Sequence, residues 1–155
     1  LALQVKLAAA SPWSKHKNET ENRKLPDNIS ARRYSYKELR DLYADSRFVV
    51  VPLYENDFQA GVTTLLEAMS MAKAVIISRT IGQKDVVTDG VNGIYVPPDD
   101  PDALRTAIER LLNDPALCDK LGMAARKTVE TEMSLKIWAQ TIARTIQSEW
   151  KLSSK

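Results

Sequence analysis

The chain has 155 residues, a formal net charge of +2 and the composition of an ordinary globular protein. This length predicts a single domain that buries a hydrophobic core without disulfides or metal ions. The small net charge gives no argument for nucleic acid or an anionic membrane surface as a partner. We therefore expect no nucleic acid and leave peripheral membrane contact open.

The single cysteine, Cys118, cannot form an internal disulfide, and we interpret it as a buried apolar side chain in a reducing compartment. The single histidine, His16, lies in a polar loop and has no second histidine with which to bind a metal ion. The opening segment LALQVKLAAA is too short to span a membrane and lacks the basic start of a signal peptide. These features predict a cytoplasmic protein. The absence of an initial methionine is compatible with a fragment of a longer chain.

The first predicted elements are two strands, at residues 1–10 and 28–34, with a polar loop between them. Ser35 and Glu38 then have the spacing of a capping box, which satisfies free backbone donors at the start of the helix SYKELRDLYADS. The run RFVVVPL that follows is rich in β-branched residues. Such a run is typical of a strand buried on both faces of a parallel sheet.

The second half continues the alternation of strands and helices. The predicted elements are a helix at 61–72, a strand at 74–78, a loop with one helical turn at 79–93 and a strand at 93–96. Asp100 with Pro101, then Pro115, then Ser134 mark the starts of three C-terminal helices. This order predicts an α/β fold, a parallel sheet with helices on both faces.

The helix at 61–72 carries one carboxylate, Glu67, on a polar face shared with Thr63 and Ser70. In parallel α/β folds, ligands bind where the strands end and helix N-termini point. The free amides at this helix start suit phosphates, and they belong to Gly61, Val62, Thr63 and Thr64. Glu67, one turn further along, is positioned to accept two hydrogen bonds from a ribose diol. The alternative is a solvated surface glutamate on a helix that binds nothing.

Three blocks of the sequence resemble retaining glycosyltransferases of the GT-B fold, in particular the large family 4. LLEAMSMAKAVI resembles the second half of the family's Glu-x7-Glu signature, with Glu67 as the second glutamate. VVTDGVNGIYVPPDDPDALRTAIERLL resembles the block that follows in the family, and SYKELRDLYADSRFVVVPL resembles the segment before the signature. Together the blocks cover about residues 28 to 150, most of the chain.

The chain departs from the family pattern at two positions where the family has glutamates, and Gly61-Val62 replaces the family's usual Phe-Gly. Gln59 stands where the family has its first glutamate, a residue that contacts the donor sugar, and Asp85 stands at the position of another family glutamate. A glutamine still forms hydrogen bonds but carries no charge. The resemblance therefore leaves the identity of the sugar open, whereas the residues expected on the nucleotide side are unchanged.

The resemblance implies that residues 1–155 form a Rossmann-like domain that binds a nucleotide-sugar donor, with C-terminal helices at 100–151. The acceptor-binding half and the Arg/Lys loop that holds the diphosphate in the family are absent from this chain. It also implies retaining transfer of the sugar to an acceptor hydroxyl, without a metal or cofactor. Gln59 is then expected at the sugar, and Arg33 and Tyr34 near the base.

Two alternatives to a transferase half remain open. A non-catalytic nucleotide-binding or interaction module of the same fold fits the absent half and Gln59, and sugar transfer by the chain alone would exclude it. A sugar-nucleotide epimerase shares the GT-B fold but resembles the three blocks less. We expect the isolated chain to transfer no sugar.

We also expect the Trp150 end of the last helix to lie exposed or to be covered by another molecule. For the Trp138 end, packing on the core is an equal alternative.

Overall fold

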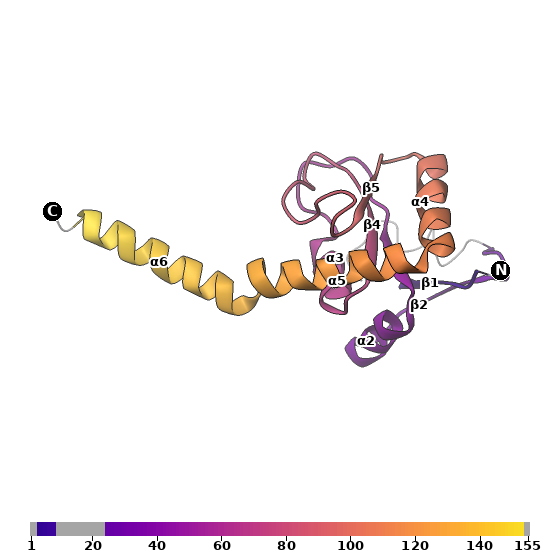
Figure 1. The fold of residues 1–155 in the computed structure, drawn as a ribbon, viewed down its shortest axis with the longest axis horizontal. Coiled ribbons are helices and arrows are strands. Elements are labelled where there is room, and N and C mark those ends of the chain that lie inside the picture. Colours follow the sequence, from indigo (N-terminus) through magenta and orange to yellow (C-terminus); the bar gives the residue numbers. More distant parts are fainter. Residues whose placement is uncertain (1–2, 9–23, 154–155) are drawn as a thin grey trace. The chain divides into compact units, whose positions relative to one another are not determined.

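The structure, a computed structural model, describes residues 3–8 and 24–153, so that His16 and most of the expected first loop lie outside the described residues. The chain falls into two compact units, Leu1–Asp45 and Ser46–Lys155, each of which is described by itself. Figure 1 shows the elements of both units. The expectation of one donor-binding domain over the whole chain stays a prediction.

The first unit contains a two-stranded parallel sheet and one helix. Strand β1 (Val5–Ala8) pairs with β2 (Ile29–Arg32), and helix α2 (Tyr36–Asp45) follows. The predicted capping box is confirmed. The Ser35 amide and hydroxyl donate to the Glu38 carboxylate at 2.8 and 2.7 Å, and the Glu38 amide donates back to Ser35 Oγ at 3.4 Å. Arg32 at the end of β2 also donates to Glu38, at 2.8 Å.

This arrangement predicts an unusually acidic Glu38. The hydrogen bond from Arg32, followed by those from Ser35, lowers the pKa of Glu38 from 4.5 to about 2. Because the folded pKa is depressed, the contribution of Glu38 to stability is complete above pH 4.5 and is lost as the pH falls towards 2. An NMR titration of the Glu38 carboxyl carbon should therefore give a midpoint near 2 in the parent. We expect a higher midpoint in Arg32→Gln and an unchanged one in the control Lys37→Gln. A parent midpoint near 4.5 would contradict the prediction.

The second unit holds a three-stranded parallel sheet in the order β3-β4-β5, of which Figure 1 labels β4 and β5. Its elements are β3 (Phe48–Val51), α3 (Val62–Ser70), β4 (Ala74–Ser78), β5 (Ile94–Val96), α4 (Pro101–Asn113), α5 (Pro115–Glu132) and α6 (Leu135–Ser153). All five residues of the central strand β4 are buried, in agreement with its apolar sequence. Both described sheets are parallel and flanked by helices, so the predicted α/β fold class is confirmed.

Helices α4 and α5 pack on the strands of this unit to form its core. The cluster contains alternate residues of β4 and β5 and the inner faces of the two helices: Ala74, Ile76, Ile94, Val96, Ala107, Leu111, Cys118 and Leu121. Cys118 is thus buried, as expected. Each helix starts at a proline and is capped by the preceding aspartate, since Asp100 Oδ1 accepts from the Ala103 amide and Asp114 Oδ1 from the Leu117 amide, at 2.8 and 2.9 Å.

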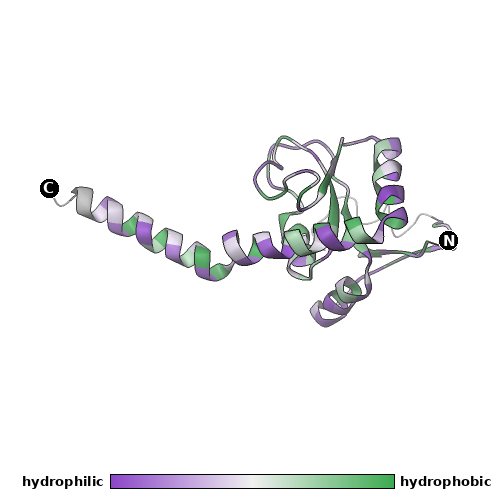
Figure 2. Cartoon of the chain, in the orientation of Figure 1, coloured by the Kyte–Doolittle hydropathy of each residue, from purple (hydrophilic) through white to green (hydrophobic). Residues whose placement is uncertain are grey.

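The last helix, α6, carries its apolar stripe on the surface. Trp138 is 62% exposed and Trp150 73%, and the stripe alternates with polar residues along the helix in Figure 2. The expectation for the Trp150 end is confirmed, and the Trp138 end is exposed as well. No helix within residues 3–8 and 24–153 is long and apolar enough to cross a membrane.

Candidate functional site

Helix α3 begins without a side-chain cap. Gly61 precedes it as the N-cap in the left-handed conformation, with φ 70° and ψ 3°, and forms no side-chain cap hydrogen bond. The first helical bond runs from the Leu65 amide to the Gly61 carbonyl at 2.9 Å. A Cβ atom at Gly61 would lie 2.8 Å from Val51 Cγ1, so both space and φ favour glycine. Exposed Thr63 and Thr64 lie in this first turn, next to solvent.

Two loops meet at the carboxyl ends of β3 and β4, next to the start of α3. The Gly82 amide donates to the Asn56 carbonyl at 3.1 Å, and the Ile81 amide donates to Glu55 Oε1 at 2.9 Å. A Cβ atom at Gly82 would lie 2.0 Å from the Phe58 carbonyl oxygen, so the two backbones touch. The loop after β4 therefore fixes the segment that leads into α3. The helical turn expected in this loop is not formed, and the loop instead has a hydrogen-bonded turn from the Gln83 amide to the Thr80 carbonyl at 3.1 Å.

The loop contacts bring together Gln59 and Asp85, the two positions at which the family has glutamates. Gln59 Nε2 donates to Asp85 Oδ2 at 3.4 Å across 26 residues of sequence. Because a carboxylate only accepts hydrogen bonds, it holds the Nε2 side of the amide and leaves Gln59 Oε1 to accept from another group. Both side chains are exposed.

The other predicted residues divide between the two units. Glu67 is half-buried on α3, four residues after Thr63, while the opposite residues Leu65 and Met69 are fully buried. Arg33 and Tyr34 belong to the first unit, where the Arg32 guanidinium lies 4.1 Å above the Tyr34 ring. Their role near a base stays a prediction.

Sequence reasoning missed one residue of the loop after β4, Gln83. Its side chain is 2% exposed, and Nε2 donates to the Ala60 carbonyl, one residue before Gly61. Nothing in the sequence distinguishes this glutamine from its exposed polar neighbours, since the segment has no periodicity. The adjacent Gly82, which permits close approach of the two loops, is the one available signal.

The described residues hold no group of three or more His, Cys, Asp or Glu side chains arranged to bind a metal ion. At the end of this parallel sheet the chain thus presents an uncapped helix start with hydroxyls, a carboxylate one turn further on and an amide–carboxylate pair. These are groups that bind a polar, phosphorylated ligand.

Comparison with known proteins identifies the family of the chain. The family model described as "Glycosyl transferases group 1" matches residues 13–128. Alpha-maltose-1-phosphate synthase of Mycobacterium tuberculosis is 33% identical over 121 residues, which cover 74% of this chain and 30% of the synthase. Sucrose-phosphate synthase from Thermosynechococcus elongatus superposes with a TM-score of 0.76 at 25% identity, over 96% of this chain and 39% of that one.

The chain therefore belongs to the glycosyl transferases group 1 family. The Anabaena protein HepE, whose structure was solved in complex with UDP-glucose, shares the fold with a TM-score of 0.69 at 21% identity, over 80% of this chain and 33% of HepE. The chain spans less than half the length of each of these three proteins.

Proposed function

We propose that the chain is the donor-binding part of a retaining glycosyltransferase of family 4. In this proposal it binds a nucleoside diphosphate sugar for transfer of the sugar to an acceptor hydroxyl. The observation that carries the proposal is the uncapped start of α3 beside the Gln59–Asp85 pair. Family membership supports a transferase, and the family resemblance of Glu67 supports a nucleotide-sugar donor.

The diphosphate would lie on the amides of Val62, Thr63 and Thr64, with the threonine hydroxyls as further donors. Hydrogen-bond donors that are already in place stabilise the charge of a departing diphosphate without reorganising. The positive end of the α3 dipole acts in the same direction. Glu67 would hold the ribose hydroxyls, since a carboxylate one turn along the helix lies beyond the phosphates.

Gln59 would face the sugar. Asp85 holds its Nε2, so Oε1 is the atom turned to accept a sugar hydroxyl. The amide supplies an acceptor without adding negative charge near the diphosphate. We propose that transfer needs no metal or other cofactor. The acceptor would bind a further domain of the same full-length protein, in the cytoplasm, with peripheral membrane contact left open.

The HepE complex with UDP-glucose supports uridine as the first base to test, and guanosine and adenosine follow. The test is an NMR titration of the ¹⁵N-labelled chain with UDP, GDP and ADP. We expect one of the three to shift the amide signals of Val62, Thr63 and Thr64, because phosphate oxygens accept hydrogen bonds from these amides. The matching nucleoside, which lacks phosphate, is the control and should leave these three signals in place.

Absence of any shift at the start of α3 with all three diphosphates would contradict the proposal. A second assay separates the alternatives. The full-length protein with donor and acceptor should transfer sugar, whereas the chain alone should not. Diphosphate binding without transfer by the full-length protein would favour a non-catalytic module, and conversion of the donor without acceptor would favour an epimerase.

A further inference from the structure

Gln83 is buried, and its side-chain amide donates to the backbone of the segment that leads into α3. The side-chain Nε2 of Gln83 donates to the Ala60 carbonyl, and the backbone carbonyl of Gln83 accepts from the Tyr95 hydroxyl at 3.1 Å. Only 2% of the residue is exposed. A buried amide without partners is costly, so this bond also fixes where Gln83 can lie.

The Ala60 carbonyl is a sensitive point for the start of α3. It lies in the same rigid peptide plane as the Gly61 amide, so a bond that holds the oxygen also sets the direction of the N–H group. Gly61 follows with φ 70°, a conformation that glycine leaves at little cost. The chain between Pro52 and Gly61 thus needs an external contact to keep the first amides of α3 in one orientation.

We propose that Gln83 is a positioning residue for the diphosphate end of the site. By holding the Ala60 carbonyl, it keeps the amides of Val62 to Thr64 directed at the phosphates. The Tyr95 hydroxyl donates to the backbone carbonyl of Gln83 and so holds this residue in place, and the Arg79 guanidinium lies 5.1 Å above the Tyr95 ring. The inference rests on the proposed function, because it assigns an orienting role within the same site.

Asn92 offers a matched control in the same region of the chain. It too is a buried amide, 4% exposed, and it donates to the Val86 carbonyl at 3.2 Å and to Thr128 Oγ1 at 3.1 Å. Its Oδ1 also accepts from the Thr88 amide at 2.7 Å, so these contacts lie within the loop between β4 and β5 and on α5, not in the segment before α3. Loss of its amide should lower stability in the way that loss of the Gln83 amide does.

The experiment compares Gln83→Glu with Asn92→Asp in the full chain, each replacing a buried amide by a carboxyl group of the same shape. UDP, GDP and ADP, each beside its free nucleoside, are titrated by NMR at a temperature where all variants are folded. We expect both variants to melt earlier. Only Gln83→Glu should lose affinity for the diphosphate that binds the parent, by about tenfold, with nucleoside affinity unchanged. In the free chain, only Gln83→Glu should move the Val62–Thr64 amide signals.

Gln83→Met, which has neither the donor nor a charge, is the second variant if Gln83→Glu does not fold. The inference is overturned if the folded Gln83 variant binds the diphosphate as the parent does. It is equally overturned if diphosphate and nucleoside affinities fall together, since that result indicates a structural role only. A parent that binds none of the three diphosphates overturns the proposed function itself, and the inference with it.

Discussion

Glu67→Ala is expected to weaken binding of the nucleoside diphosphate about a hundredfold. Two charge-assisted hydrogen bonds to ribose hydroxyls contribute about 3 kcal/mol once they are removed from water, and the alanine variant loses both. The chain should stay folded, because the core side of α3 is formed by Leu65 and Met69, which are fully buried. Calorimetric titration of UDP, GDP and ADP into parent and variant measures the effect.

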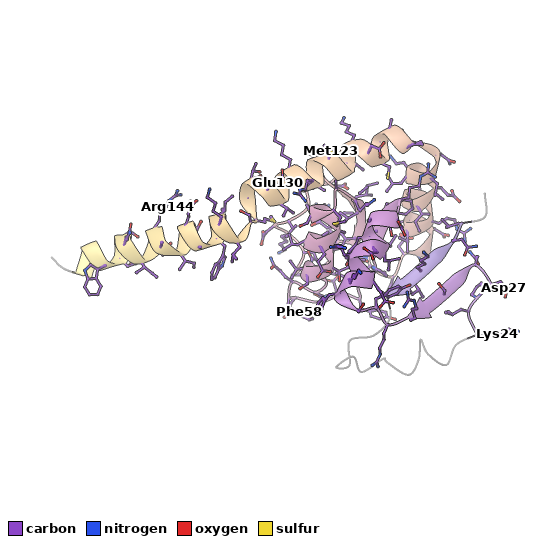
Figure 3. All side chains as sticks on the ribbon, turned by 90° about the horizontal axis from the view of Figure 1, so that it is seen from below. Lys24, Asp27, Phe58, Met123, Glu130 and Arg144 are labelled. Atoms are coloured by element: carbon purple, nitrogen blue, oxygen red, sulfur yellow. The ribbon has the colours of Figure 1, made fainter. Side chains whose placement is uncertain are left out.

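Two further variants calibrate this result. Glu67→Gln keeps the shape but removes the charge, and should lose less affinity than Glu67→Ala. Glu130→Ala removes an exposed carboxylate of α5 that pairs with Arg126, and should bind as the parent does (Figure 3). Parent-like affinity of Glu67→Ala for each diphosphate would reduce Glu67 to an ordinary helix residue.

Gly122→Ala should destabilise the fold by about 3 kcal/mol, although alanine is the better helix former by about 1 kcal/mol. Gly122 lies in α5, where an added Cβ would be 2.2 Å from the Ala72 carbonyl oxygen and 3.2 Å from the Ala74 amide nitrogen. Ala72 is already in the left-handed region with φ 54°, in the turn between α3 and β4. The clash is therefore with backbone atoms, and the turn that contains them has little freedom to move away from an added methyl group.

Urea denaturation followed by circular dichroism measures the free energy of unfolding. The control is Met123→Ala at the neighbouring position of α5, where the side chain is 66% exposed and projects from the helix (Figure 3). It should change stability by less than about 0.5 kcal/mol. A Gly122→Ala variant as stable as the parent would mean that α5 does not pack this closely on the turn.

The elements of the second unit were predictable because each has a local signal. The apolar run AVIIS could only be a buried strand or helix segment, and it forms β4. Asp100 with Pro101 marks one helix start and Pro115 marks another, and both starts are confirmed, the second with Asp114 as its cap. Apolar runs and helix-start patterns involve only residues that are close in the chain, so they can be identified from a single sequence.

The contacts around the candidate site were harder to predict from the sequence. Gln59 and Asp85 are 26 residues apart and meet where two irregular loops are joined by the bond from the Gly82 amide to the Asn56 carbonyl. Gln83 is buried within a segment of polar residues, so its burial follows from tertiary contacts and not from composition. The family resemblance indicated Gln59 and Glu67 but gave no role for Gln83. Tertiary contacts of loop residues cannot be predicted from local sequence patterns, because such loops have no periodicity.

Helices α4 and α5 complete their own first turns with Asp100 and Asp114, whereas α3 relies on no side chain of its own. A phosphate at α3 would do for this helix what an aspartate does for the other two. Nucleotide would then act as a removable part of the fold, and the free energy of unfolding would rise with its concentration. In a cell with little nucleotide sugar, most of the protein would be free of ligand and would therefore be least stable. Under the proposed function, degradation of the unfolded chain would then link the amount of this protein to the supply of nucleotide sugar.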